Sequence, residues 1–354
     1  MTEQLKKMTA EEFVKKVLAG ERDFSCISLS GQNLNRYEGF WEMQDYLKRC
    51  HFSEDEANLG KNPIILTGSV LIGVYAHGLY LPYVKAEGAD FTGSYFDNAC
   101  FIRGDFEEAE FSHVSLKNAW LSDVLEVTSF NKASLHQANL AGACLKYAQL
   151  EDTDLGKADL DGANLDYAVL KQANLEKASL VSTSFREADL EGANLEEVNA
   201  ARAYFRHTNL KGVNLRGANL SKATLRAADL TGANLFGARV MKADIERANF
   251  TGADLRDVVF NGSYAEQAEF SEADLSGTLV PMVNFAYARL RGAKNFDKCH
   301  GLDSANYFGT IVTPDQKIII EVAMKSRELF FVKEVQSEKS KVEGSGTIVG
   351  SQDG

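Results

Sequence analysis

Histidine and cysteine are the side chains of this 354-residue sequence best suited to bind a metal ion or to act as a nucleophile. Cys50 and His51 are adjacent, as are Cys299 and His300, but neither pair has a second cysteine or histidine at the spacing of zinc ligands. The other histidines occupy unrelated positions (His77, His113, His136 and His207). The GxSxG, Walker, HExxH and dinucleotide-binding motifs are absent from the sequence. We therefore predict no catalytic residue, no metal site and no bound cofactor.

Carboxylates are abundant, with 50 Asp and Glu residues against 38 Lys and Arg residues and a net charge of −12. Paired carboxylates can act as general acid and base. Here, however, nearly all of them occupy the outward positions of a repeat, and we interpret them as solvated surface. The net negative charge also disfavours direct binding to nucleic acid, which requires a positive surface.

The sequence carries no signal for a membrane or for secretion. It has no run of about 18 apolar residues, and its N-terminus lacks the apolar core of a signal peptide. The five cysteines are odd in number and scattered, which is typical of a reducing compartment. We predict a cytoplasmic protein that does not enter the membrane.

A repeat of five residues positions these polar groups. In the segment 158–180 leucine occupies every fifth position, with alanine two residues before it. A five-residue period circles the surface of a helix and alternates between the faces of a strand. A chain that turns a corner every five residues instead directs each leucine toward one axis. The predicted core therefore includes Leu160, Leu165, Leu170, Leu175, Leu195, Ala158 and Ala163.

The register of this repeat extends far along the chain. From Phe130 to Leu290 every fifth residue is Leu, Phe, Val or Ile, except Ala200 and Ala265. Where the central residue is Ala200, the preceding small position holds Val198, so the buried volume is roughly conserved. Large and small inward residues that alternate in this way fill a narrow tube without voids.

The motif that results, A(D/N)LXX, resembles that of the pentapeptide-repeat family over about residues 66–300. The resemblance implies an all-β solenoid, namely a right-handed quadrilateral β-helix with four pentapeptides per coil. The repeats from Leu66 to Leu290 then form about eleven coils, or a rod roughly 55 Å long at ~4.8 Å per coil. Between Leu121 and Leu125 the period shifts by one residue, and we expect Leu125 to restart the register.

The N-terminal region precedes the main repeats. Residues 1–21 are predicted to form an α-helical cap, because Thr9 and Glu12 make a capping box and an open solenoid exposes its core at each end. Residues 22–34 form a first short set of repeats.

Residues 35–65 interrupt the repeat with an aromatic-rich insertion that includes Phe40, Trp41 and Tyr46. We expect it to be helical. It either packs on the side or end of the rod, or protrudes as a recognition element.

The repeats of the β-helix are predicted to span residues 66–310. Residues 311–335 are apolar enough to cover the last coil as a cap, or to form a homodimer contact, and their pattern does not distinguish helix from strand. Residues 336–354 are polar and rich in Gly and Ser, and we predict a disordered tail.

Residues 20 apart stack on one face of such a rod. Arg186, Arg206 and Arg226 form one column, with His207 beside Arg206. This column either docks an acidic partner or is neutralised by nearby carboxylates (Glu187, Asp189, Asp229 and Glu246). A second column of amides is predicted to form a ladder between coils (Asn174, Asn194, Asn214 and Asn234).

Function must lie on the outer faces, because the interior is occupied by packed side chains. Residues 201–250 are rich in basic residues, and acidic segments flank them on both sides. We predict a non-enzymatic scaffold that binds a protein partner, whose identity the sequence does not give, through the flat faces of its β-helix. The family resemblance implies an alternative, a DNA mimic that binds a type II topoisomerase such as gyrase and protects it against quinolones. The basic residues depart from what a phosphate mimic requires.

Overall fold

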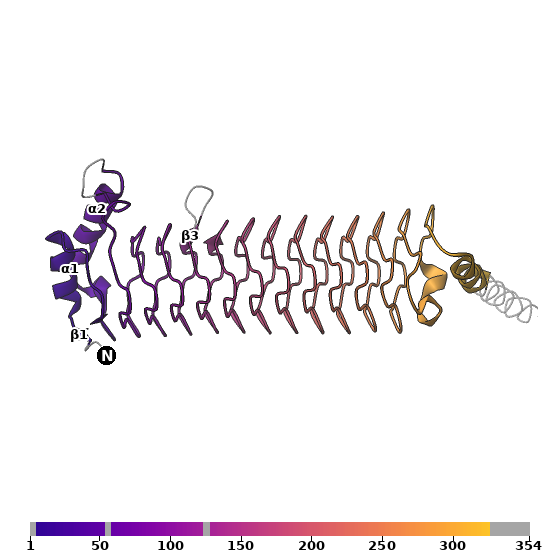
Figure 1. Ribbon diagram of the computed structural model, residues 1–354, viewed down its shortest axis with the longest axis horizontal. Coiled ribbons are helices and arrows are strands. Elements are labelled where there is room, and N and C mark those ends of the chain that lie inside the picture. The colour runs from indigo at the N-terminus through magenta and orange to yellow at the C-terminus, as the bar shows by residue number, and fades with distance from the viewer. Residues whose placement is uncertain (1–4, 54–57, 123–127, 326–354) are drawn as a thin grey trace, which may run out of the picture.

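The chain folds into a long rod, and the computed structural model describes residues 5–53, 58–122 and 128–325 (Figure 1). Parallel bridges join residues 20 apart, as between Asn174 and Asn194 and between Asn194 and Asn214. The rod is a right-handed β-helix solenoid. Because 20 residues hold four pentapeptides, each coil has four faces.

Pairing between coils consists almost entirely of isolated bridges rather than strands. The strands are short, with β1 (Lys6–Lys7) parallel to β2 (Ile27–Ser28) and β3 (Trp120–Ser122) parallel to β4 (Cys144–Leu145). The reason is geometric, because two of every five residues form a turn and only one residue per face lies between turns in bridge position. The all-β class predicted from the sequence is therefore realised with very little extended strand.

Backbone hydrogen bonds hold each coil to the next. The Leu195 amide donates to the Asn214 carbonyl at 2.7 Å, and the Asn214 amide donates to the Ala193 carbonyl at 3.0 Å. The second turn residue has positive φ whether or not it is glycine, as at Gly162 (67°) and Glu197 (55°). That corner position therefore accepts long polar side chains.

Large and small side chains alternate inside the rod and fill it. The predicted core residues Leu160, Leu165, Leu170, Leu175, Leu195, Ala158 and Ala163 are all buried, as are Ala200 and Val198. Aromatic rings occupy the bore in the N-terminal half, where the Phe106 and Phe130 rings stack with centroids 5.1 Å apart. Gly104 is buried two residues before Phe106, at a position where most coils carry alanine.

One coil in the interior of the rod is longer than its neighbours. Asp105 bridges Ser129, so this coil takes 24 residues instead of 20. We expected Leu125 to restart the register; within the described residues the register resumes at Phe130, whose carbonyl accepts a backbone bond from the Ala133 amide in the ordinary turn pattern. Leu125 itself lies outside the described residues.

Helix α1 (Ala10–Leu18) begins at a capping box in which the Thr9 side chain accepts from the Glu12 amide and Glu12 accepts from the Thr9 amide. Its buried face includes Phe13, whose ring lies 4.8 Å from that of Phe24 in the first coil. The first coil also contains the 3₁₀ turn η1 (Leu34–Arg36).

Helix α2 (Gly39–His51) forms the fourth side of this first coil and lies beside α1 (Figure 1). Elsewhere in the coil a backbone carbonyl accepts from the coil above, as Gln32 does from the Tyr75 amide at 2.9 Å. On the α2 side the buried Gln44 side chain does so instead, and its Oε1 accepts from the Tyr80 amide at 2.5 Å. The glutamine thus replaces the missing backbone acceptor.

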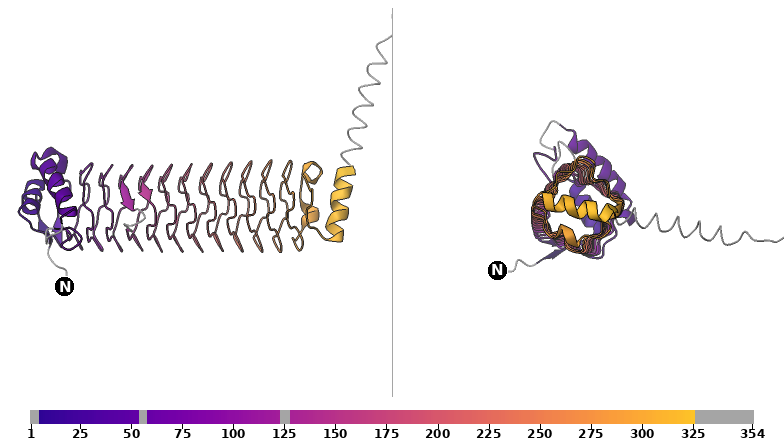
Figure 2. Two further views of the ribbon diagram at one scale, coloured as in Figure 1. Left: turned by 90° about the horizontal axis from the view of Figure 1, so that it is seen from above. Right: turned by 90° about the vertical axis from the view of Figure 1, so that its right-hand side faces the viewer.

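A helix at 314–325 lies across the last coil (Figure 2), beyond the 3₁₀ turns η2 (Phe296–Lys298) and η3 (Leu302–Ser304). Ile320 is buried on the inner side of this helix, and Gln316 Nε2 donates to the Leu290 carbonyl at 2.9 Å. Ile318 and Val322 are exposed on its outer side. The predicted disordered tail at 336–354 lies outside the described residues. None of the helices in the described ranges is long and apolar enough to span a membrane.

Candidate interaction surface

Residues of the two cysteine–histidine pairs identified in the sequence make hydrogen bonds within the fold. Burial raises the pKa of the Cys299 thiol to about 12, and its Sγ donates to the Leu275 carbonyl at 3.4 Å. His51 hydrogen-bonds through Nδ1 to the Tyr80 hydroxyl. Within residues 5–53, 58–122 and 128–325, no cluster of three or more His, Cys, Asp or Glu is arranged to hold a metal ion.

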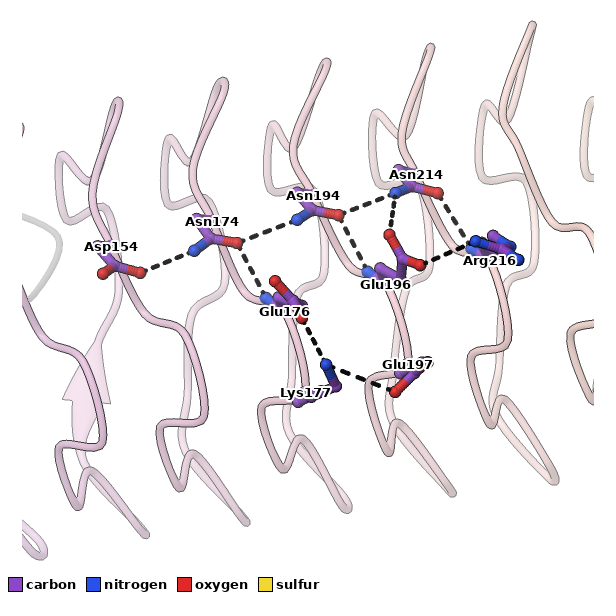
Figure 3. A network of polar contacts seen from close by, with 9 residues as sticks. All are labelled: Asp154, Asn174, Glu176, Lys177, Asn194, Glu196, Glu197, Asn214 and Arg216. Carbon is purple, nitrogen blue, oxygen red and sulfur yellow. Dashed lines mark hydrogen bonds and ion pairs between the residues drawn. The ribbon is translucent and has the colours of Figure 1, made fainter.

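An amide ladder runs along one face of the rod (Figure 3). Asn194 Nδ2 donates to Asn174 Oδ1 at 3.1 Å, and Asn214 Nδ2 donates to Asn194 Oδ1 at 3.0 Å. The bond from Asn234 to Asn214 continues the column at 3.4 Å, so the predicted ladder is confirmed. Each Oδ1 also accepts a backbone amide two residues on, as Asn194 does from Glu196 at 3.2 Å.

The ladder has a direction, because every side-chain amide donates toward the N-terminus. At that end Asn174 donates to Asp154 Oδ1 at 2.9 Å, and a carboxylate suffices there because it only accepts. The ladder stops at Asp254, which has no N–H to offer Asn234 and accepts instead from Arg256 at 2.8 and 2.7 Å. The choice between Asp and Asn in the A(D/N)LXX motif therefore depends on the neighbouring coil.

This direction predicts different effects on stability for two similar substitutions. Asn194→Asp removes the donor to Asn174 and sets two acceptors against each other, which is expected to lower the free energy of unfolding by about 1 kcal/mol. Asp154→Asn keeps the acceptor for Asn174 and is expected to change stability little. Thermal melts followed by circular dichroism measure both variants. Equal destabilisation would contradict a directional ladder.

The arginine column is partly neutralised. Arg186 Nε lies 3.4 Å from Glu187 Oε1, and Arg226 lies 2.7 Å from Glu246 Oε1. Between them Arg206 is exposed and has no ion pair with any described residue, and His207 beside it is also exposed. The three arginines of the column therefore differ in their availability to a partner.

Two carboxylates expected to neutralise this column pair elsewhere. Asp189 and Asp229 lie 3.3 Å from Lys171 and Lys211, respectively, at the next corner of the coil. The bond to Asp189 raises the pKa of Lys171. Similarly, the bonds from Arg256 hold the pKa of Asp254 below its usual value. Both shifts favour the charged forms of exposed pairs, whose contribution to stability is small.

A further basic row escaped the sequence analysis. Arg202, Lys222 and Lys242 are 20 residues apart and stack in successive coils at the corner that precedes the arginine column. All three are exposed, and their side chains make no ion pair within the described part of the chain. Their spacing in the sequence was sufficient to find them.

The aromatic residues of the insertion do not form one surface. Phe40 is buried, and Tyr46 is half-buried and accepts a hydrogen bond from Arg22 at 2.9 Å. Trp41 is 56% exposed, and its ring meets that of Phe40 edge-on at 5.0 Å. Of the three, Trp41 alone presents most of its ring to solvent.

Comparisons with known proteins agree with this repeat geometry. The model of the family described as pentapeptide repeats matches eight copies, over residues 89–125, 124–156, 158–196, 201–237 and 243–280. The sequence matches none of the curated proteins searched.

Two solved structures illustrate the similarity. HetL, a pentapeptide repeat protein involved in heterocyst differentiation regulation from the cyanobacterium Nostoc sp. strain PCC 7120, is 27% identical, with 75% of this chain and 96% of HetL covered and a TM-score of 0.36. The plasmid-mediated fluoroquinolone resistance protein QnrB1 is 17% identical, with 70% of this chain and 97% of QnrB1 covered and a TM-score of 0.34. Since the family matches span about half of the sequence, the chain belongs to the pentapeptide-repeat family.

Proposed function

We propose that this protein is a non-enzymatic scaffold that binds another protein through the flat outer faces of its β-helix. The observation that carries the proposal is the filled bore, in which Leu, Phe and Ala side chains leave recognition to the exterior. The exterior side chains recur once per coil on a rigid frame, which suits an extended protein interface. Family membership supports the same conclusion.

The ends of the rod complete this proposal. In this proposal α1 caps the first coil of the rod, and the helix at 314–325 caps the last. The buried Ile320 and the Gln316 hydrogen bond support the second cap. The exposed Ile318 and Val322 are the residues that a homodimer would use, and light scattering of the purified protein measures that association. We place the scaffold in the cytoplasm.

Affinity capture with cross-linking tests the scaffold. The folded chain is immobilised, exposed to lysate at low and high ionic strength, and cross-linked before mass spectrometry. We expect a protein cross-linked to lysines of the outer faces. The Leu195→Asp variant, whose central coils should be unfolded, serves as the control for non-specific capture. Recovery of no specific protein at any ionic strength would refute the proposal.

The alternative function is mimicry of duplex DNA toward a type II topoisomerase. The elongated rod and the net charge of −12 favour it, whereas the exposed Arg202, Arg206 and Lys222 disfavour it. A gyrase supercoiling assay with and without ciprofloxacin distinguishes the two functions. The absence of any effect at micromolar protein excludes the mimic and leaves the scaffold.

A further inference from the structure

One face of the rod carries basic side chains along both of its edges. Arg202 and Lys222 stack at one corner, and Lys242 extends that row by one coil. Arg206 lies at the opposite corner of the same face, and Tyr204 lies between the two corners. We call this surface the basic face and define it by these five residues.

The cations of the basic face have no anionic partner. Arg202, Arg206, Lys222 and Lys242 form no ion pair with a described residue. Several other cations on the rod are paired, as Arg216 is with Glu196 at 3.4 Å. Like charges stacked at ~4.8 Å repel one another, so this arrangement costs stability unless an anion is bound.

Tyr204 adds an aromatic surface at the centre of the basic face. Tyr204 is 51% exposed, and the residues that bridge it in adjacent coils are the smaller Ser184 and Thr224. Two other exposed tyrosines, Tyr75 and Tyr95, are stacked on each other at 4.2 Å. The Tyr204 ring contacts no other ring of the described residues. Tyrosine beside arginine is a frequent composition of protein-binding hot spots.

We propose that the basic face binds a short acidic segment of a protein, a specificity that rests on the scaffold function proposed above. Carboxylates of that segment pair with Arg202, Arg206 and Lys222, and an apolar side chain covers Tyr204. The basic row spans three coils, or about 10–15 Å, which matches three or four residues of extended chain. On the edge that carries Arg206, the column continues through Arg226 to Glu246, and these two residues already form an ion pair.

The limited length of the basic face favours a peptide over a nucleic acid. Acidic segments precede and follow residues 201–250, and the whole chain carries a charge of −12. A longer polyanion that lay along the rod would meet these carboxylates and be repelled. A short acidic peptide avoids them.

The test measures binding of a fluorescein-labelled peptide, Gly-Glu-Glu-Trp-Glu-Glu-Gly, by fluorescence anisotropy at low salt. We expect the double variant Arg202→Glu/Arg206→Glu to weaken binding about tenfold or more. Glu197 and Glu246 already occupy the equivalent repeat positions, so this variant should fold. The control is Lys157→Glu. Lys157 has a φ of 56° and is the second turn residue of its repeat, as Arg202 is, but it lies on another face of the rod. This variant should leave binding of the peptide unchanged.

Tyr204→Ser provides a second variant, because Ser184 holds the same position one coil earlier. It should weaken binding of the tryptophan peptide more than that of a peptide with glycine in place of tryptophan. Three results would overturn the proposal. The double variant could bind the peptide as tightly as the parent protein, Lys157→Glu could weaken binding as much as the double variant does, or an oligouridylate of equal charge could bind more tightly than the peptide. If the double variant still captures the same protein from lysate, this specificity fails while the scaffold function stands.

Discussion

Replacing Leu195 with aspartate is expected to unfold the central coils of the rod. Leu195 is fully buried, and its amide donates to the next coil. A carboxylate there has no partner within the bore, and a buried, unpaired charge costs about 4 kcal/mol or more. Because each coil contacts only its neighbours, the damage spreads from the substituted coil along the rod. Circular dichroism melts should show a large loss of stability and a broadened transition.

A surface substitution controls for the added charge. Ser182→Asp places the same carboxylate at a corner with φ of 59°, a position that Asp152 and Asp257 occupy with φ of 57° in other coils. This variant should melt like the parent protein. If Leu195→Asp also melted like the parent, the inward orientation of the central leucines would be wrong.

Replacing Gly104 with alanine is expected to lower the free energy of unfolding by about 1–3 kcal/mol. An added Cβ would lie 2.4 Å from Phe106 Cε2 and 2.8 Å from the Phe101 carbonyl oxygen. The backbone of Gly104 is not left-handed, so the penalty comes from contacts with the Phe106 ring and with the Phe101 carbonyl oxygen. Chemical denaturation monitored by circular dichroism gives the value.

The same packing argument predicts a rescue. Phe106→Leu removes the ring that the new methyl group would meet, and Gly104→Ala/Phe106→Leu restores the usual Ala and Leu of the repeat. The double variant should be more stable than the sum of the single effects predicts, with a coupling of about 1 kcal/mol. If the two losses of stability were additive, the Phe106 ring would not be the reason that residue 104 must be glycine.

Most of the fold was predictable because the five-residue period constrains the direction of every side chain. The filling of the bore and the amide ladder both follow from which residues are 20 apart. The 24-residue coil was not predictable from hydrophobicity, since Leu125 satisfies the period in the sequence. Only the bridge between Asp105 and Ser129 reveals that this coil has four residues more than its neighbours.

The candidate site was only partly predictable, since ion pairing depends on the exact reach of side chains at neighbouring corners. The column of Arg186, Arg206 and Arg226 follows from spacing, but the pairing of Asp189 with Lys171 instead of this column does not. Gln44 is a stronger case. Nothing in the sequence of its helix indicates that the Gln44 side chain accepts the hydrogen bond of the Tyr80 amide, 36 residues later in the chain, in place of a backbone carbonyl.

The polarity of the asparagine ladder bears on how such a rod changes over evolution. Duplication of a coil that carries asparagine extends the column and preserves every bond, so the array can lengthen at little cost. Exchange of two coils is different, since moving Asp154 behind Asn174 would remove a donor and break the column there. The number of coils can therefore change during evolution with little loss of stability, whereas the hydrogen bonds of the ladder constrain their order.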